Sequence, residues 1–242
     1  MNKPILGIIG GVGPLATACF MGALIRKTPA RRDQDHMPMI IFNDPQSPDR
    51  TAHILDHRKA NPQPEMEKVA RWLERAGADY IAIACNTAHY YYEGVVDAVS
   101  IPVVNIMEET ASKLSADIGR GKLVGLLATE GTIASGVFQD YLKRHALKTM
   151  EPTSEEQTIV TSLIYDGVKA GARYDRNQLL ELASGLHERG CDAVIVGCTE
   201  LSVIYQELDE RPSWLYDSLD VLAERCVDIY QRARKNGGTL EI

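Results

Sequence analysis

The chain contains the segment Gly77-Ala-Asp-Tyr-Ile-Ala-Ile-Ala-Cys85-Asn-Thr87 and repeats its pattern as Gly190-Cys-Asp-Ala-Val-Ile-Val-Gly-Cys198-Thr-Glu200. In each copy a glycine turn leads into a short, unbroken apolar run, which is typical of a strand buried in a parallel sheet. A cysteine follows, with polar residues that can begin a helix. The offset between the copies, from 77 to 190 and from 85 to 198, is 113 residues. The repeat predicts two similar lobes that face one another across a cleft.

The rest of the chain fits this interpretation, because short apolar runs alternate with longer helical patterns. The expected strands are residues 5–9, 39–42, 80–84, 103–105, 123–127, 193–196 and 214–216. The expected helices are residues 15–27, 65–76, 108–118, 138–144, 155–169, 177–189 and 219–234. We therefore predict an α/β fold of two pseudo-twofold related lobes, with mostly parallel sheets flanked by helices and the active site in the cleft between them.

The two repeated cysteines are the candidate reactive groups. Ligands of open parallel sheets bind beyond the carboxyl ends of the strands, which is where Cys85 and Cys198 lie in the predicted fold. A single cysteine in such a place is usually an inert buried residue, but matching positions in a repeat favour a functional pair. Racemisation of an amino acid needs one group to remove the Cα proton and another to return a proton on the opposite face. One thiolate and one thiol would do this.

The residues that follow each cysteine can support this chemistry. A free cysteine has a pKa of about 8.5, and a helix N-terminus favours its thiolate. Asn86, Thr87 and Thr199 can add hydrogen bonds, and the backbone N–H groups there can hold the substrate α-carboxylate, where charge grows as Cα loses its proton.

Composition excludes several other classes of protein. The net charge of −7 argues against a nucleic-acid partner, which needs clustered Lys and Arg. No apolar run approaches the roughly 18 to 20 residues that span a bilayer, and the start of the chain lacks a signal-peptide pattern. We expect a cytoplasmic protein with free thiols, in which Cys19, Cys191 and Cys226 are structural. No zinc-ligand spacing is present, so no metal site is expected.

A glycine-rich turn follows the first expected strand, as Gly10-Gly-Val-Gly-Pro-Leu-Ala16. From Gly11 it resembles a dinucleotide-binding fingerprint. The acidic residue that should end the second strand is missing, however, since the first acid beyond that strand is Asp44. A turn whose N–H groups approach a small carboxylate explains the segment equally well. Gly11 is therefore predicted to contact the substrate.

With these features in place, the chain resembles the aspartate/glutamate racemase family, and within it the aspartate racemases. The resemblance covers nearly the whole chain and rests on the following motifs: Gly7-Ile-Ile-Gly-Gly-Val-Gly-Pro-Leu-Ala-Thr17, Asn43-Asp-Pro-Gln-Ser-Pro-Asp-Arg-Thr51, Cys85-Asn-Thr-Ala-His89, Ile106-Met-Glu-Glu-Thr110, Leu127-Ala-Thr-Glu-Gly-Thr132, Tyr165-Asp-Gly-Val-Lys-Ala-Gly171 and Gly197-Cys-Thr-Glu-Leu201. It implies catalysis without pyridoxal phosphate or another cofactor, a homodimer, and a C-terminal helix that returns to the first lobe. We accordingly divide the chain into an N-terminal lobe of residues 1–107 and 217–242 and a C-terminal lobe of residues 108–216.

The resemblance also assigns residues. Cys85 and Cys198 match the catalytic pair, and Arg50 and Lys169 match the cations that hold the side-chain carboxylate of aspartate. An arginine fork suits a carboxylate independently of the resemblance. The expected substrate-binding set is Gly11, Arg50, Asn86, Thr87, Lys169, Thr199 and Glu200.

The sequence leaves several alternatives open. The substrate could be glutamate or a broader set of amino acids, or the enzyme could be an isomerase or decarboxylase of small dicarboxylates in the same fold. A non-catalytic module that binds small acids is the last alternative. Val12 and Ala84 depart from the family pattern where many relatives have methionine and proline. His89, four residues after Cys85, could tune that thiol, whereas a Cys/His protease would leave Cys198 unexplained.

Overall fold

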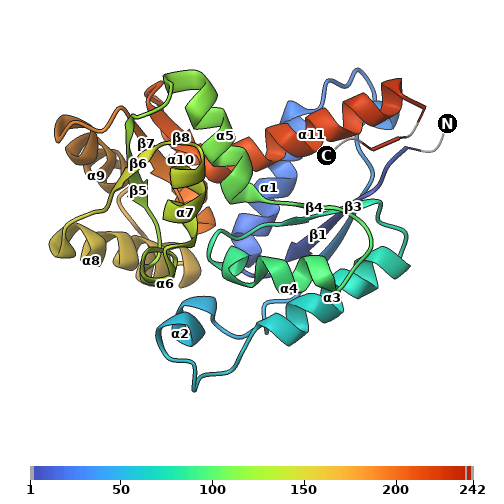
Figure 1. Ribbon diagram of the computed structural model, residues 1–242, viewed down its shortest axis with the longest axis horizontal. Helices are drawn as coiled ribbons and strands as arrows, with labels where there is room; N and C mark the ends of the chain where they lie inside the picture. Colours follow the sequence, from blue (N-terminus) through green and yellow to red (C-terminus); the bar gives the residue numbers. More distant parts are fainter. Residues whose placement is uncertain (1–2, 238, 241–242) are drawn as a thin grey trace.

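The computed structural model describes residues 3–237 and 239–240, and this part of the chain forms two four-stranded parallel sheets flanked by helices (Figure 1). The first sheet has the order β2-β1-β3-β4, and the second has the order β6-β5-β7-β8. All neighbouring strands are parallel. The strands are β1 (Leu6–Gly10), β2 (Met39–Asn43), β3 (Tyr80–Ile83), β4 (Val103–Val104), β5 (Leu123–Leu127), β6 (Lys148–Met150), β7 (Ala193–Val196) and β8 (Leu215–Asp217). The equivalent strand order confirms the predicted fold class and the internal repeat.

Helices connect the strands and cover both faces of each sheet. The α-helices are α1 (Pro14–Lys27), α2 (Arg50–Leu55), α3 (Gln63–Arg75), α4 (Tyr92–Asp97), α5 (Ile106–Ile118), α6 (Glu130–Ser135), α7 (Val137–Arg144), α8 (Ser154–Ser162), α9 (Asn177–Glu188), α10 (Thr199–Gln206) and α11 (Ser218–Lys235). Two short 3-10 helices, η1 (Asp33–Asp35) and η2 (Thr87–Tyr91), and one π-helical segment, η3 (Leu163–Lys169), complete the described elements.

One hydrophobic core joins the two sheets. Ile8 of β1 and Ile195 of β7 belong to the same buried cluster, together with Leu24 of α1, Leu114 of α5 and Leu222 of α11. Helix α11 leaves the second sheet after β8 and packs on α1 and α5 (Figure 1). Burial of apolar surface is the main stabilising term in folding, so this shared core fixes the two sheets relative to one another.

The two lobes also touch at the carboxyl ends of their strands. Helix α2, which follows β2, packs against α6, which follows β5 (Figure 1). Gly131 of α6 makes this possible, because a Cβ there would lie only 2.8 Å from Cα of Thr51. The loops and helix starts of both sheets are thereby brought to one shared edge.

Some local predictions were wrong. Residues 155–169 do not form a single α-helix, since α8 ends at Ser162 and the chain continues as a π-helix to Lys169. Strand β6 and the short helices α2, α4 and α6 were not expected. Within residues 3–237 and 239–240, no helix is both long and apolar enough to cross a membrane.

Candidate active site

Cys85 and Cys198 hold equivalent places at the carboxyl ends of the two sheets. Each is separated from its strand by one residue, Ala84 after β3 and Gly197 after β7. Cys198 is the N-cap residue of α10, and Cys85 stands two residues before the first residue of η2. The two side chains are only 4% and 3% exposed. Both sulfurs act electrostatically on Lys169, so they belong to one site.

Cys198 is held next to a carboxylate. Its Sγ donates a hydrogen bond to Oε2 of Glu200 over 3.1 Å. Burial and the negative charge of Glu200 raise the pKa of the Cys198 thiol well above its ordinary value, against smaller opposing effects from Lys169 and the backbone N–H of Glu200. In this structure Cys198 is therefore a protonated thiol that can act as an acid.

Cys85 is held next to a cation. Arg50 stands in the first turn of α2, whose N-cap Asp49 accepts a hydrogen bond from the backbone N–H of Ala52 over 2.7 Å. Burial of the Arg50 guanidinium favours a lower pKa, but the charges of Cys85, Asp49 and Glu200 and a hydrogen bond with Cys85 raise it above its ordinary value. The guanidinium Nη1 also donates to the carbonyl oxygen of Pro48 over 3.0 Å. Arg50 is thus fixed beside the first cysteine.

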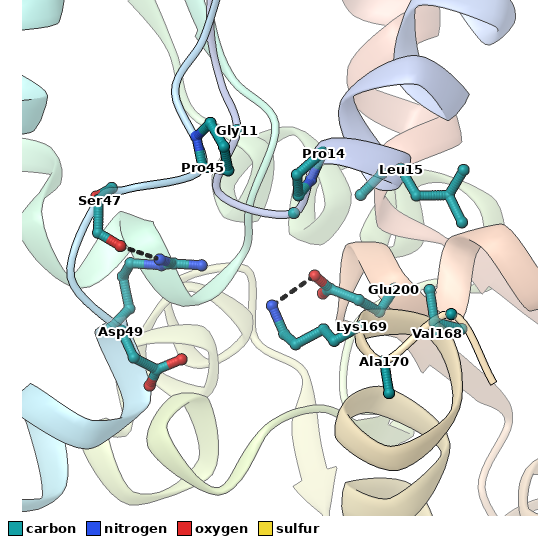
Figure 2. A pocket seen from close by; sticks show the side chains of 14 residues that line it. Gly11, Pro14, Leu15, Pro45, Ser47, Asp49, Val168, Lys169, Ala170 and Glu200 are labelled. Carbon is teal, nitrogen blue, oxygen red and sulfur yellow. Dashed lines mark hydrogen bonds and ion pairs between the residues drawn. The ribbon is translucent and has the colours of Figure 1, made fainter.

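Lys169 lies at the end of η3 and forms an ion pair with Glu200, Nζ to Oε1, over 2.7 Å. Burial favours a lower pKa for this amine, but the charge of Glu200, its hydrogen bond and the two cysteines together raise the pKa above its ordinary value. Figure 2 shows Lys169 and Glu200 facing one another on one side of the pocket, with Ser47 and Asp49 on the opposite side. The site thus holds two cations, Arg50 and Lys169, and two carboxylates, Asp49 and Glu200.

Two hollows meet at this arrangement. The outer one has a volume of about 600 Å³ and is lined by glycine-turn residues such as Gly11 and Gly13, together with Asp49, Arg50, Lys169 and Glu200. The inner one has a volume of only about 10 Å³. It is lined by the same four charged residues and also by Cys85, Thr87, Thr129 and Tyr165. A space of that size holds at most one water molecule. The charged side chains must therefore move before an amino acid can reach Cys85.

The predicted residues Asn86 and Thr199 line neither hollow, but each leaves a polar atom without a partner. Asn86 donates from Nδ2 to Oγ of Ser218 over 2.9 Å, while its Oδ1 is buried without a hydrogen bond. The hydroxyl of Thr199 is likewise buried and without a hydrogen bond. Buried polar atoms are nearly always hydrogen-bonded. Each of these two atoms belongs to the residue that directly follows one of the cysteines.

The predicted residue Thr87 lines the inner hollow and also joins the lobes. Its hydroxyl lies 2.9 Å from that of Thr129 and 3.0 Å from that of Thr132. The hydroxyls of Thr129 and Thr132 lie 3.0 Å from each other, which closes a buried triangle. The first turn after Cys85 is thereby tied to the turn after β5.

His89 does not contact a thiol. Its ring lies between the backbone of Cys85 and that of Ile106, and burial lowers its pKa to about 4. The geometry makes His89 a positioning residue for the loop that carries Cys85.

Several residues of the site were missed at the sequence level. Asp49, Thr129 and Tyr165 line the inner hollow, and Tyr165 reaches across the lobes to form a side-chain hydrogen bond with Thr51. Burial raises the pKa of Tyr165 to about 12. A signal was available for Tyr165, which stands four residues before Lys169 in a motif already quoted.

Among residues 3–237 and 239–240, no three His, Cys, Asp or Glu side chains gather in a way that could hold a metal ion. All five cysteines are free.

Comparisons with known proteins agree with this geometry. A model of the Asp/Glu/hydantoin racemase family matches residues 9–226. The broad specificity amino-acid racemase of Bacillus subtilis is 29% identical over 237 residues, which is 93% of this chain and 98% of that protein. The glutamate racemase of Geobacter metallireducens is 30% identical over 149 residues, 59% of this chain and 52% of that protein. Among solved structures, the aspartate racemase of Picrophilus torridus has a TM-score of 0.78 and 31% identity, and the alignment covers 98% of this chain and 96% of that one.

Proposed function

Since this chain belongs to the Asp/Glu/hydantoin racemase family, we propose that it interconverts L- and D-aspartate without pyridoxal phosphate, with Cys85 and Cys198 as its two acid/base groups. The observation that carries the proposal is the unequal setting of the two cysteines. Arg50 stands beside Cys85, whereas Cys198 donates a hydrogen bond to Glu200. A neighbouring cation favours a thiolate, and a neighbouring carboxylate favours a thiol.

The proposed reaction uses this difference directly. The thiolate of Cys85 removes the Cα proton from one face of the amino acid and becomes a thiol. The electron pair left on Cα is delocalised into the α-carboxylate, and the thiol of Cys198 then delivers its proton to the opposite face. The next turnover in the same direction requires the two sulfurs to exchange proton states. Asn86 and Thr199 supply unpaired polar atoms near the site for the ammonium and α-carboxylate groups.

The choice of aspartate rests on the two cations. A dicarboxylic amino acid presents a second carboxylate, and both Arg50 and Lys169 line the two hollows. An arginine fork binds a carboxylate with two parallel hydrogen bonds. The Picrophilus torridus aspartate racemase, at 31% identity over nearly the full length, supports the same substrate.

The outer hollow favours a second candidate, racemisation of larger amino acids. Its volume of about 600 Å³ is far more than the side chain of aspartate needs. The resemblance to a broad specificity racemase over 93% of the chain supports this candidate, and glutamate is the nearest larger substrate. A panel of L-amino acids in the assay below separates the two candidates.

The proposal includes a cytoplasmic homodimer. Five free thiols suit a reducing compartment. The dimer follows from the family resemblance and is tested by light scattering of the purified chain.

The deciding experiment follows exchange of the Cα proton of L-aspartate in D₂O by NMR, and loss of optical activity by circular dichroism. Wild type, Cys85→Ser and Cys198→Ser are compared without added cofactor, and Cys191→Ser is the matched control for a buried thiol outside the site. We expect exchange and racemisation in wild type and Cys191→Ser and a loss of at least about a thousandfold in the other two. Full racemisation by both serine variants would refute the mechanism, and an inactive wild type would refute aspartate as the substrate.

A further inference from the structure

The contact between Lys169 and Glu200 has a consequence for how substrate enters. We propose that Glu200 is an internal competitor for the substrate's side-chain carboxylate. Glu200 is the ion-pair partner of Lys169 in this structure, and a dicarboxylate opens the site by replacing Glu200 as the partner of that amine. This inference rests on the proposed function, because it assigns Lys169 to the side-chain carboxylate.

Glu200 is placed where a ligand carboxylate would be expected. Its side chain is only 4% exposed, although it points into the hollow that Figure 2 shows. Oε2 accepts a hydrogen bond from the Cys198 thiol, and Oε1 lies 2.7 Å from Nζ of Lys169 in a buried ion pair. A ligand carboxylate would make the same kind of charge-assisted contact with this amine, so it and Glu200 would compete for Lys169.

The glycine turn is shaped to admit this carboxylate. A Cβ at Gly13 would lie 2.4 Å from Oε1 of Glu200, which no side chain at position 13 could tolerate unless Glu200 moved. Pro14, the next residue, begins α1 and lines the same hollow. The glycine-rich turn, which resembles a dinucleotide-binding loop, therefore packs against the Glu200 carboxylate.

The ion pair stands at the boundary between the two hollows. Lys169 and Glu200 both line the outer space of about 600 Å³ and the inner space of about 10 Å³. Asp49 and Arg50 line both spaces as well, whereas Cys85 lines only the inner space and Cys198 lines neither. Lys169 is the last residue of the π-helical segment, its side chain is 24% exposed, and Gly171 follows in a left-handed conformation with no neighbouring atom within 4 Å of a Cβ there.

The exchange keeps the charges balanced. When the substrate carboxylate takes Lys169, the released Glu200 can accept the substrate ammonium group, so each carboxylate keeps a cationic partner. An amino acid with an uncharged side chain brings an ammonium group for Glu200 but nothing for Lys169. Glu200 would thus act as a specificity-determining residue that favours amino acids with a second carboxylate.

The test uses succinate, a dicarboxylate with no ammonium group, and measures its dissociation constant by calorimetry. In Glu200→Gln the competing charge is gone while the shape remains, so we expect succinate to bind about tenfold more tightly than in wild type. The control Glu210→Gln, which removes an exposed carboxylate, should leave the affinity unchanged. The double variant Lys169→Gln/Glu200→Gln should bind succinate no more tightly than wild type, because the amine that holds the carboxylate is gone. Unchanged or weaker binding by Glu200→Gln would overturn the inference.

A second measurement needs no variant. A crystal structure of wild type with succinate should show one succinate carboxylate on Lys169 and Glu200 turned away from it. Succinate bound with the Lys169–Glu200 pair intact would overturn the inference, as would failure of both wild type and Glu200→Gln to bind succinate. The racemisation assay on wild type is separate. If Glu200→Gln binds succinate more tightly but wild type does not racemise aspartate, the competitor role of Glu200 stands and the proposed function is refuted. If wild type racemises aspartate but Glu200→Gln binds succinate no more tightly, only the competitor role is refuted.

Discussion

His89 supports Cys85 through the backbone rather than through the thiol, because its Nδ1 lies 2.8 Å from the carbonyl oxygen of Cys85. On the other side of the ring, Nε2 accepts the backbone N–H of Ile106 over 3.2 Å. A carbonyl can only accept and a backbone N–H can only donate, so the ring is neutral and carries its proton on Nδ1. Protonation of Nε2 would break the second of these hydrogen bonds.

This arrangement predicts that acid weakens the fold through His89. Burial lowers its pKa from 6.5 to about 4, so between these values the unfolded chain binds more protons than the folded one. The stability that His89 contributes is full above about pH 6.5 and is lost as the pH falls to about 4, with a total of about 3 kcal/mol. Urea unfolding of wild type and His89→Gln from pH 4 to 7 should give a shallower pH dependence in the variant. Parallel curves would contradict this assignment.

Asp217 should act in the opposite direction over the same pH range. Its side chain caps α11, and Oδ1 accepts the hydroxyl of Ser202 over 2.5 Å. Burial raises the pKa of Asp217 from 3.8 to about 7, so the folded chain binds more protons than the unfolded one between these values. The contribution of Asp217 to stability is therefore full below about pH 4 and is lost as the pH rises to about 7. In unfolding experiments Asp217→Asn should gain stability relative to wild type as the pH rises, and a constant difference would contradict the prediction.

The sheets and the cysteine pair could be predicted because their signal is local. A strand buried on both faces needs an unbroken apolar run, and β3 and β7 provide one at the same distance before a cysteine. The parallel arrangement then follows from the helices between the strands, and the position of both thiols follows from the carboxyl edge. No long-range contact had to be known for these steps.

The remaining features depend on contacts between segments far apart in sequence. The π-helical segment η3 packs Gly167 against Tyr174, and Tyr165 from the same segment reaches Thr51 in the other lobe. A helical pattern alone does not distinguish this from a continuous α-helix. The closure of the inner hollow depends on Lys169 meeting Glu200, which no sequence spacing indicates. Helix α2 was predictable in part, since Asp49 is a favourable N-cap residue.

Arg50 is expected to be irreplaceable by lysine. The guanidinium contacts Cys85 and two backbone carbonyls at once, whereas an ammonium group keeps the charge but loses the planar fork. If the proposed function is correct, Arg50→Lys should lower kcat/KM for aspartate by about 100-fold, close to 3 kcal/mol. Initial rates from the optical assay measure this, with the exposed Arg26→Lys as the control. A decrease of less than threefold would show that charge alone is sufficient at this position.

The buried hydroxyls of Thr87, Thr129 and Thr132 contact one another, so removing one of them should lower the stability of the fold more than removing the hydroxyl of an exposed threonine. Thr87→Val keeps the shape but removes the hydroxyl that faces Thr129 and Thr132 from the other lobe. The two remaining hydroxyls can still bond to each other, so the loss should be about 1 to 2 kcal/mol rather than more. Chemical unfolding measures it, and Thr158→Val, on the exposed face of α8, should change stability by less than about 0.5 kcal/mol. Equal losses in the two variants would mean that the triangle contributes nothing of its own.

Two glycines with positive φ separate the cost of conformation from the cost of crowding. Gly11 has φ of +80°, and Gly136 is left-handed with φ of +67° and ψ of 1°, so alanine is strained at both, by about 1 kcal/mol at Gly136. A Cβ at position 11 would lie 2.2 Å from the backbone carbonyl carbon of Asp44, whereas a Cβ at position 136 would meet no atom within 4 Å. Backbone atoms cannot turn aside as a side chain can, so Gly11→Ala should displace the segment after β2 that leads to Arg50. We expect Gly11→Ala to lose at least about 3 kcal/mol in chemical unfolding and to lose racemase activity with it, while Gly136→Ala loses about 1 kcal/mol and stays active. Equal losses in the two variants would show that the turn can move without disturbing the site.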